Sequence, residues 1–451
     1  MENLNWLPDT LLRKARHYSR QLWVRVVAMG LLAILVLGLT QIIEWLVPDQ
    51  MGSRLTGAAA DRLLQIIANA MLAVTTFSLT VMVTVYRSSS TQWTPRVHRL
   101  IMQDPVTQNT LAAFIGAYVY ALIAIIMREL GVYVDERALV LFAVTVLVLA
   151  FIVFNLVRWV LHLQTFGSLI DTTRQVEGIA RRQFAERLAT PCLGARPLIG
   201  AAPDNTRIIR ATQSGYIQHI YPQALDKAAR MHGVDLYLTR DIGSFVFLNE
   251  PLVQVRDTGA PPADGCDDDT LARAVRDNVV LDDVRSYDQD PRFGLMVMGE
   301  IASKALSPGI NDPGTAIDVI TRVGRILSDY SDETQGNGDL PYPNLWVHPL
   351  EPTDLIEDGF GSLARDGAAV IEVQQRLQST LTGLMHHPDK GLQDAARIAA
   401  GIELRRAWSA LKFDHDRARL RRSVAEAVWN DVADDLNPRQ DQGTDRAPER
   451  D

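Results

Sequence analysis

Cysteine is nearly absent from this 451-residue chain, which contains only Cys192 and Cys266. Cysteines this few and this far apart cannot form a structural zinc site or a disulfide framework. Histidine is scattered, and the adjacent pair His386-His387 has no Cys, Glu or third His at ligand spacing. These absences predict unpaired thiols, no metal site and no bound cofactor.

The chain also has no excess of positive charge. The chain has 45 Lys and Arg against 53 Asp and Glu, which gives a formal net charge of -8. A nucleic-acid-binding domain normally carries a basic face, so this balance argues against such a partner. The sequence also lacks a phosphate loop, a nucleophile–base pair and a cluster of metal ligands. It therefore predicts no catalytic residue, and we do not expect an enzyme.

What the chain does contain is a set of long apolar runs in its first third, at residues 26–47, 63–86, 111–127 and 138–157. A helix rises about 1.5 Å per residue and the hydrocarbon core is about 30 Å thick, so each run is long enough, or nearly so, to cross it. No small-residue cleavage site follows the first run, which argues against a removed signal peptide. We predict a transmembrane domain of four helices over residues 1–165, embedded in the lipid bilayer.

Basic residues flank these runs unevenly. They are frequent before the first run, between the second and third, and after the fourth, and they are sparse in the other two connections. Cytoplasmic loops carry the excess of Lys and Arg. We therefore predict a multi-pass protein of the bacterial inner membrane with both termini in the cytoplasm.

The second run carries a polar stripe. At about 100° per residue its members fall within an arc of roughly 80°. They are Asn69, Thr76, Thr80, Thr84 and Arg87. Lipid tolerates such groups poorly, so this face is expected to contact protein or water. Two interpretations stay open: hydrogen bonds between helices, or the lining of a pore or substrate path.

Further basic groups lie toward the predicted cytoplasmic side of the membrane. Arg96 follows the second run, and Arg158 and His162 lie at the end of the fourth. A ring of such side chains around an oligomer axis would attract anions at the cytoplasmic entrance of a path. The alternative is the ordinary basic flank of a membrane helix.

We predict that the chain after residue 165 forms a cytoplasmic α+β domain attached to the membrane domain. An amphipathic helix and a linker occupy 166–205. Strands at 216–220, 235–238, 245–248 and 252–255 and a helix at 223–231 predict a small module over 206–257, which resembles a barrel-sandwich fold. Residues 270–435 predict a helical domain, and the charged segment 436–451 predicts a disordered tail.

The most distinctive stretch runs from residue 288 to residue 316. Its composition predicts a helix over 295–306 that ends before Pro308, and a second helix that begins at Asp312 as N-cap with Pro313 in its first turn. The candidate residues of this signature turn are Lys304, Ser307, Asn311 and Asp312. The turn is either a structural corner or part of a site or subunit interface.

These motifs also carry a family resemblance. The run Ala-Leu-Ser-Pro-Gly-Ile-Asn-Asp-Pro at 305–313, the Thr-Gln-x-x-Pro-Arg-Val connection at 91–97 and the layout of four apolar runs resemble a bacterial family of predicted membrane proteins that is catalogued only as a domain of unknown function. Gly314 stands where that family is expected to have a bulkier residue. The resemblance implies the membrane architecture and implies no activity.

Our leading hypothesis from the sequence is a homo-oligomeric channel or channel-like transporter with a cytoplasmic gating or vestibule domain. The basic residues slightly favour anions over cations as the permeant species. Its partners would be the lipid bilayer, further copies of the chain and a small ion, and no nucleic acid. The alternative is a non-transporting membrane scaffold or sensor whose cytoplasmic domain binds a partner or ligand. A third hypothesis, an intramembrane enzyme, has no catalytic pairing to support it.

Overall fold

The computed structural model describes residues 22–46, 57–131, 138–263, 266–335 and 340–436. The chain divides into two compact units, Met1–Thr172 and Thr173–Asp451, which we call the N-terminal and the C-terminal unit.

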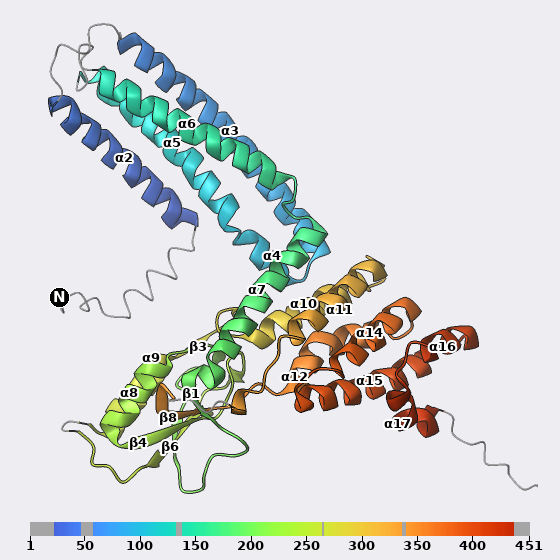
Figure 1. The fold of residues 1–451 in the computed structure, drawn as a ribbon. Helices are drawn as coiled ribbons and strands as arrows, with labels where there is room; N and C mark the ends of the chain where they lie inside the picture. The colour runs from blue at the N-terminus through green and yellow to red at the C-terminus, as the bar shows by residue number, and fades with distance from the viewer. Residues whose placement is uncertain (1–21, 47–56, 132–137, 264–265, 336–339, 437–451) are drawn as a thin grey trace, which may run out of the picture. The chain divides into compact units, whose positions relative to one another are not determined.

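The N-terminal unit is a bundle of long helices that run side by side (Figure 1). Its helices are α2 (Leu22–Leu46), α3 (Gly57–Gln92), α4 (Pro95–Met102), α5 (Pro105–Glu129) and α6 (Ala138–Leu163). Helix α5 contacts α2, α3 and α6. It is more enclosed than α3 and α6, since 56% of the most apolar part of the segment Pro95–Glu129 is buried, against 22% for Ala58–Gln92 and for Val140–Leu163. Small residues permit this close packing: a Cβ at Gly116 would lie 2.9 Å from Cβ of Met29.

Membrane character is clear in this unit. Three helical segments, Ala58–Gln92, Pro95–Glu129 and Val140–Leu163, are long and apolar enough to cross a bilayer, and Trp23–Leu39 is a shorter apolar helix. The outer surface carries large exposed apolar side chains, among them Leu147 at 69% exposure. A surface of this kind is suited to lipid rather than water. The prediction of membrane-spanning helices is thus confirmed for about three segments, and the predicted span 26–47 coincides with the shorter helix.

The C-terminal unit contains two open sheets. The five-stranded sheet has the order β1 (Ala195–Pro197), β8 (Tyr342–Val347), β4 (Val234–Leu238), β6 (Pro251–Asp257) and β2 (Arg207–Arg210). The three-stranded sheet has the order β5 (Phe245–Val246), β3 (Gly215–Ile220) and β7 (Val279–Asp282). Helix α8 (Pro222–His232) packs on β4 and β8 and on helix α9 (Asp268–Asn278). Apolar side chains of both sheets and of these two helices form one core.

The open sheets correct the predicted barrel-sandwich fold. Predicted strands at 216–220, 235–238 and 252–255 and the helix at 223–231 are confirmed, and the strand at 245–248 is shorter than predicted. However, β1, β7 and β8 come from outside 206–257, and β8 pairs in parallel with both β1 and β4. Parallel pairing joins segments that are distant in the chain, so it leaves no short-range hairpin signal.

The remainder of the C-terminal unit is helical, although the predicted helical domain at 270–435 also contributes β7 and β8 to the sheets. Its helices are α7 (Leu169–Ala189), which begins at the boundary between the units, α10 (Pro291–Ala305), α11 (Pro313–Leu327), α12 (Pro352–Ile356), α13 (Ser362–Asp366), α14 (Ile371–Leu384), α15 (Lys390–Ala410), α16 (Asp414–Arg421) and α17 (Glu426–Leu436), with a π-helical turn at Glu357–Gly361 and 3-10 turns at Pro191–Gly194 and Glu333–Gln335. Consecutive helices pack as neighbours, α10 on α11 and α14 on α15 (Figure 1). The predicted tail lies outside the described residues beyond Leu436.

One close approach between helices is made possible by a glycine. A Cβ at Gly294 in α10 would lie 2.5 Å from Cβ and 2.8 Å from Cα of Ala180 in α7. At Gly178, two residues before Ala180 and on the other side of α7, nothing lies within 4 Å of an added Cβ. The two glycines therefore offer a matched pair for testing the contact between α7 and α10.

We expect Gly294→Ala to destabilise the C-terminal unit by roughly 1–3 kcal/mol, because the added methyl group overpacks a fixed helix contact. Gly178→Ala should instead stabilise it by up to about 1 kcal/mol, because alanine is the better helix former. Thermal unfolding of the full-length protein in detergent, followed by near-UV circular dichroism, measures both. If the two variants changed the thermal unfolding midpoint equally, α7 and α10 would not be in contact.

Candidate functional site

The predicted polar stripe lies on α3 and is exposed along its whole length. Its residues, Asn69, Thr76, Thr80, Thr84 and Arg87, are all classed as exposed. The three threonine hydroxyls donate to carbonyl oxygens one turn earlier in the same helix, at 2.9, 3.0 and 2.8 Å. The opposite face of α3, with Leu64, Met71 and Ser78, is buried. We call the exposed set the polar face of α3.

The side chains of this face do not bond to other helices of the chain. Within the described residues, the Asn69 amide and the Arg87 guanidinium have no hydrogen bond or ion pair, and each threonine hydroxyl bonds only to its own helix. Bonding between helices of one chain, the alternative interpretation from the sequence, therefore has no support in the described chain. The face is available to lipid, to water or to a second copy.

The three candidate residues at the predicted entrance are placed differently from one another. Arg96 on α4 and Arg158 on α6 are exposed. His162 is half-buried, and its Nε2 lies 2.9 Å from Asp104 Oδ2 and 3.3 Å from Thr107 Oγ1. Because Asp104 also caps α5 by accepting from the Thr107 N–H at 2.7 Å, His162 fastens the end of α6 to the start of α5. The sequence analysis missed Asp104, although an Asp-Pro pair before an apolar run is a helix-start signal.

The signature turn is a tightly bonded corner between α10 and α11. Asp312 caps α11 as predicted, since its carboxylate accepts from the N–H of Thr315 at 3.1 Å and from its hydroxyl at 2.5 Å. The Asp312 N–H donates to the carbonyl of Ala305 at 2.8 Å, and Ser307 Oγ donates to the carbonyl of Lys304 at 2.6 Å. These contacts support the structural interpretation of this corner.

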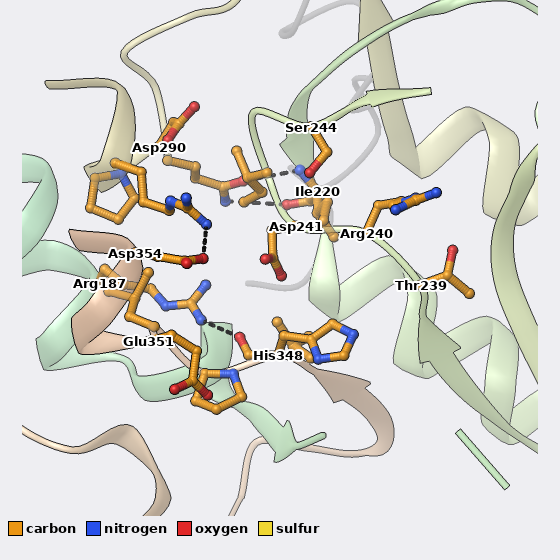
Figure 2. Close-up of a pocket in the computed structure, with 17 residues that line it drawn as sticks. Arg187, Ile220, Thr239, Arg240, Asp241, Ser244, Asp290, His348, Glu351 and Asp354 are labelled. Atoms are coloured by element: carbon orange, nitrogen blue, oxygen red, sulfur yellow. Dashed lines mark hydrogen bonds and ion pairs between the residues drawn. The ribbon is translucent and has the colours of Figure 1, made fainter. Parts of the chain in front are cut away.

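A pocket with a volume of about 230 Å³ lies within the C-terminal unit. Five separate segments line it: α7 at Arg187, the end of β3 at Ile220, the turn after β4 at 239–244, the start of α10 at 289–292, and the end of β8 with the chain after it at 347–354 (Figure 2). The segment 289–292 belongs to the distinctive stretch of the sequence. The pocket thus lies where the sheets meet the helical part of the unit.

A buried ion pair builds one wall of the pocket. The Glu333 carboxylate is fully buried and accepts from Arg187 Nε at 2.5 Å, from Arg187 Nη2 at 3.0 Å, from the Cys192 N–H at 3.0 Å and from the Leu350 N–H at 2.6 Å. Arg187 Nη2 also donates to the carbonyl of His348 at 2.9 Å. Burial disfavours the charge of Arg187, but its hydrogen bonds and attraction to Glu333 raise its pKa above the ordinary value.

A second set of ion pairs holds the start of α10. Asp290 accepts from Arg285 Nε at 2.6 Å and from Nη2 at 3.1 Å, and it caps α10 through the Phe293 N–H at 2.9 Å. Arg292 donates to Asp358 in the π-helical turn and to Asp354, each at 2.6 Å. Every one of these guanidinium groups is therefore already engaged by a carboxylate.

Glycine is required where the turn after β4 meets this cluster. Gly243 has φ of +85°, and a Cβ there would overlap the Asp290 carboxylate and the Arg285 guanidinium. The close approach brings Asp241 and Ser244 to the pocket.

Asp241 occupies the middle of the pocket (Figure 2). Its carboxylate makes no hydrogen bond or ion pair within the described residues. Burial raises the pKa of Asp241, while the nearby charges of His348, Arg292 and Arg187 act in the opposite direction. No local motif marks Asp241, Arg187 or His348 in the sequence, because they come together only through the fold.

Known proteins were compared with the chain. Residues 19–383 match a family model described as Predicted membrane protein (DUF2254). The chain is 26% identical over 381 residues to "Uncharacterized protein Rv1290c" of Mycobacterium tuberculosis strain H37Rv and to "Uncharacterized protein Mb1321c" of Mycobacterium bovis, covering 78% of this chain and 68% of each relative. No solved structure matches the chain. The family resemblance read from the sequence is confirmed.

We expect Glu333→Gln to destabilise the C-terminal unit by roughly 3–5 kcal/mol, because it leaves the buried Arg187 without its counter-charge. The exposed pair of Arg397 with Asp431 offers a control, and Asp431→Asn should leave the unfolding midpoint nearly unchanged. Thermal unfolding of the full-length variants measures both. If Glu333→Gln unfolds like the wild type, the ion pair does not stabilise the unit.

The two thiols should differ in reactivity. Cys192 is 1% exposed, and burial together with Glu333 raises its pKa to about 12, so almost none of it is thiolate at pH 8. Cys266 is partly exposed. Maleimide at pH 8 should label Cys266 and leave Cys192 unmodified until the protein is denatured, as peptide mass spectrometry would show. Rapid labelling of Cys192 in the folded protein would contradict this placement.

Proposed function

The chain belongs to the DUF2254 family of predicted membrane proteins, and from this premise we propose that it forms a homo-oligomeric channel or channel-like transporter. In this proposal the polar face of α3 from each copy lines a path at the symmetry axis. Four helices span the inner membrane, with the segment 26–47 as the first. The C-terminal unit lies in the cytoplasm as a gating or vestibule domain, as the distribution of basic residues favours.

The single observation that carries the proposal is the exposure of the polar face of α3. The amide of Asn69 and the guanidinium of Arg87 have no partner among the described residues. An amide without a partner is costly in hydrocarbon, and a polar face on a membrane helix normally contacts protein or water. A second copy or a water-filled path would satisfy both groups.

The packing of the N-terminal unit supports a path between copies rather than through one copy. Side chains such as Phe114, Tyr120 and Leu141 fill the interior around α5 and are almost completely buried. Four packed helices of this kind enclose little space, whereas a closed symmetric ring creates an opening at its axis. The polar face is also opposite to the face of α3 that packs inside the unit.

Charge favours an anion as the permeant species. Arg87 ends the polar face, and Arg96 and Arg158 are also exposed. A ring of cationic side chains concentrates anions at the entrance of a pore.

A second candidate function is supported by the pocket of the C-terminal unit. A polar cavity of about 230 Å³ with an unpaired carboxylate suits a ligand-binding domain. In that case the protein is a membrane-anchored sensor that does not transport. Flux measured with and without a ligand of the pocket separates the two functions.

We expect purified protein in liposomes to conduct chloride, and Thr80→Val to lower that flux several-fold. The Thr80 hydroxyl donates within α3, but its oxygen can still accept a hydrogen bond from water around the ion, and the loss of such a bond costs about 1 kcal/mol. Thr75→Val is the matched control, since Thr75 lies off the polar face and is only half-exposed.

Arg87→Glu should shift the reversal potential toward cation selectivity, because it replaces the positive charge at the end of the polar face with a negative one. Absence of flux for the wild type under every ion gradient would overturn the channel proposal.

A further inference from the structure

The charges around the pocket are not balanced. The carboxylates of Glu333, Asp290, Asp354 and Asp358 are engaged by Arg187, Arg285 and Arg292. Beyond these pairs, the carboxylates of Asp241 and Glu351 also line the pocket, and neither has an ion pair within the described residues. Arg240 is exposed. The carboxylate of Asp241, in the middle of the pocket (Figure 2), therefore has no direct partner among the described residues, although the charges of Arg187, Arg292 and His348 lie near it.

An enclosed ionised carboxylate without a hydrogen-bond donor is unfavourable, and a cation that enters the pocket relieves this cost. Three guanidinium groups line the pocket. Those of Arg187 and Arg292 do not offer the same opportunity to an anion, because each is already bound by carboxylates at 2.5 to 3.0 Å. That of Arg240 is exposed, and its side chain points away from Asp241 (Figure 2). Electrostatics thus selects a positively charged ligand.

The other lining groups indicate an organic cation. Apolar side chains surround the carboxylate: Ile220, Ile242, Pro291, Val347, Pro349 and Leu350. Within the described residues, no group of three His, Cys, Asp or Glu is arranged to hold a metal ion. A volume of about 230 Å³ admits only a small molecule.

We propose that this pocket binds a small organic amine, whose ammonium group pairs with Asp241 and whose apolar body contacts the surrounding aliphatic and proline side chains. The hydroxyl of Ser244 and the imidazole of His348 line the same pocket and are available to a polar substituent of the ligand. This inference names the ligand class of the sensor function, and it is also compatible with a ligand-gated channel.

The test is binding of simple amines to the full-length protein in detergent. Butylamine and phenethylamine are compared with the neutral butanol and 2-phenylethanol and with the anionic butyrate. We expect the amines to raise the thermal unfolding midpoint in a concentration-dependent way and to bind at least about tenfold more tightly than the alcohols in titration calorimetry. Binding of butyrate in preference to butylamine would overturn the proposal.

Variants of Asp241 separate binding from folding. Asp241→Asn should lose the amine preference and should leave the unfolding midpoint of the free protein unchanged or higher, because the carboxylate makes no hydrogen bond there. Asp241→Glu should keep the preference, and Glu351→Gln, at an exposed residue of the pocket lining, should alter binding little. If Asp241→Asn fails to fold, or binds amines like the wild type, Asp241 is not the anchor and the proposal is wrong.

The result is independent of the flux measurement. Amine binding without ion flux would remove the channel and keep the pocket. Ion flux without amine binding, and without an effect of amines on that flux, would remove the pocket ligand and keep the channel.

Discussion

Four hydrogen bonds converge on the buried carboxylate of Glu333, and the C-terminal unit depends on them. Through Arg187 and the N–H groups of Cys192 and Leu350, this side chain connects α7, the turn before β1 and the chain after β8. It also stabilises a turn in which Cys192 and Leu193 have positive φ of 49° and 60°, a conformation that costs an L-residue roughly 1–2 kcal/mol. Without that carboxylate the charge of Arg187 would be buried alone.

The same interaction determines the shape of the pocket. Arg187 and the chain at 347–354 form one wall, and the ion pairs of Asp290 and Arg292 form another. Gly243 lets the turn after β4 approach these pairs, so that Asp241 lies between the walls. The Arg187 and Arg292 guanidinium groups of these walls are paired with carboxylates, whereas the Asp241 carboxylate has no direct partner among the described residues. The distinctive stretch of the sequence therefore has two roles, a wall of the pocket at its start and a helix corner at its end.

In the N-terminal unit, the two faces of α3 differ in character, and this difference limits where its polar side chains can find partners. Helix α3 packs inside the unit with one face and exposes polar side chains on the other. The threonines satisfy their hydroxyl groups within the helix, whereas Asn69 and Arg87 need an external partner in a membrane. This requirement is the basis of our proposal that several copies of the chain assemble and that transport takes place between them.

The sequence by itself determined the apolar helices, the helix cap at Asp312, most strands of 206–257 and the family, because hydrophobic periodicity and capping are local properties of the chain. It also located the polar face of α3, since helical spacing alone defines that face. Only the tertiary structure decided that the sheets are open and that β1, β7 and β8 join them, because strand pairing between distant segments leaves no local pattern. The pocket follows the same rule: Arg187, Asp241 and His348 belong to different elements, and packing alone brings their charges together.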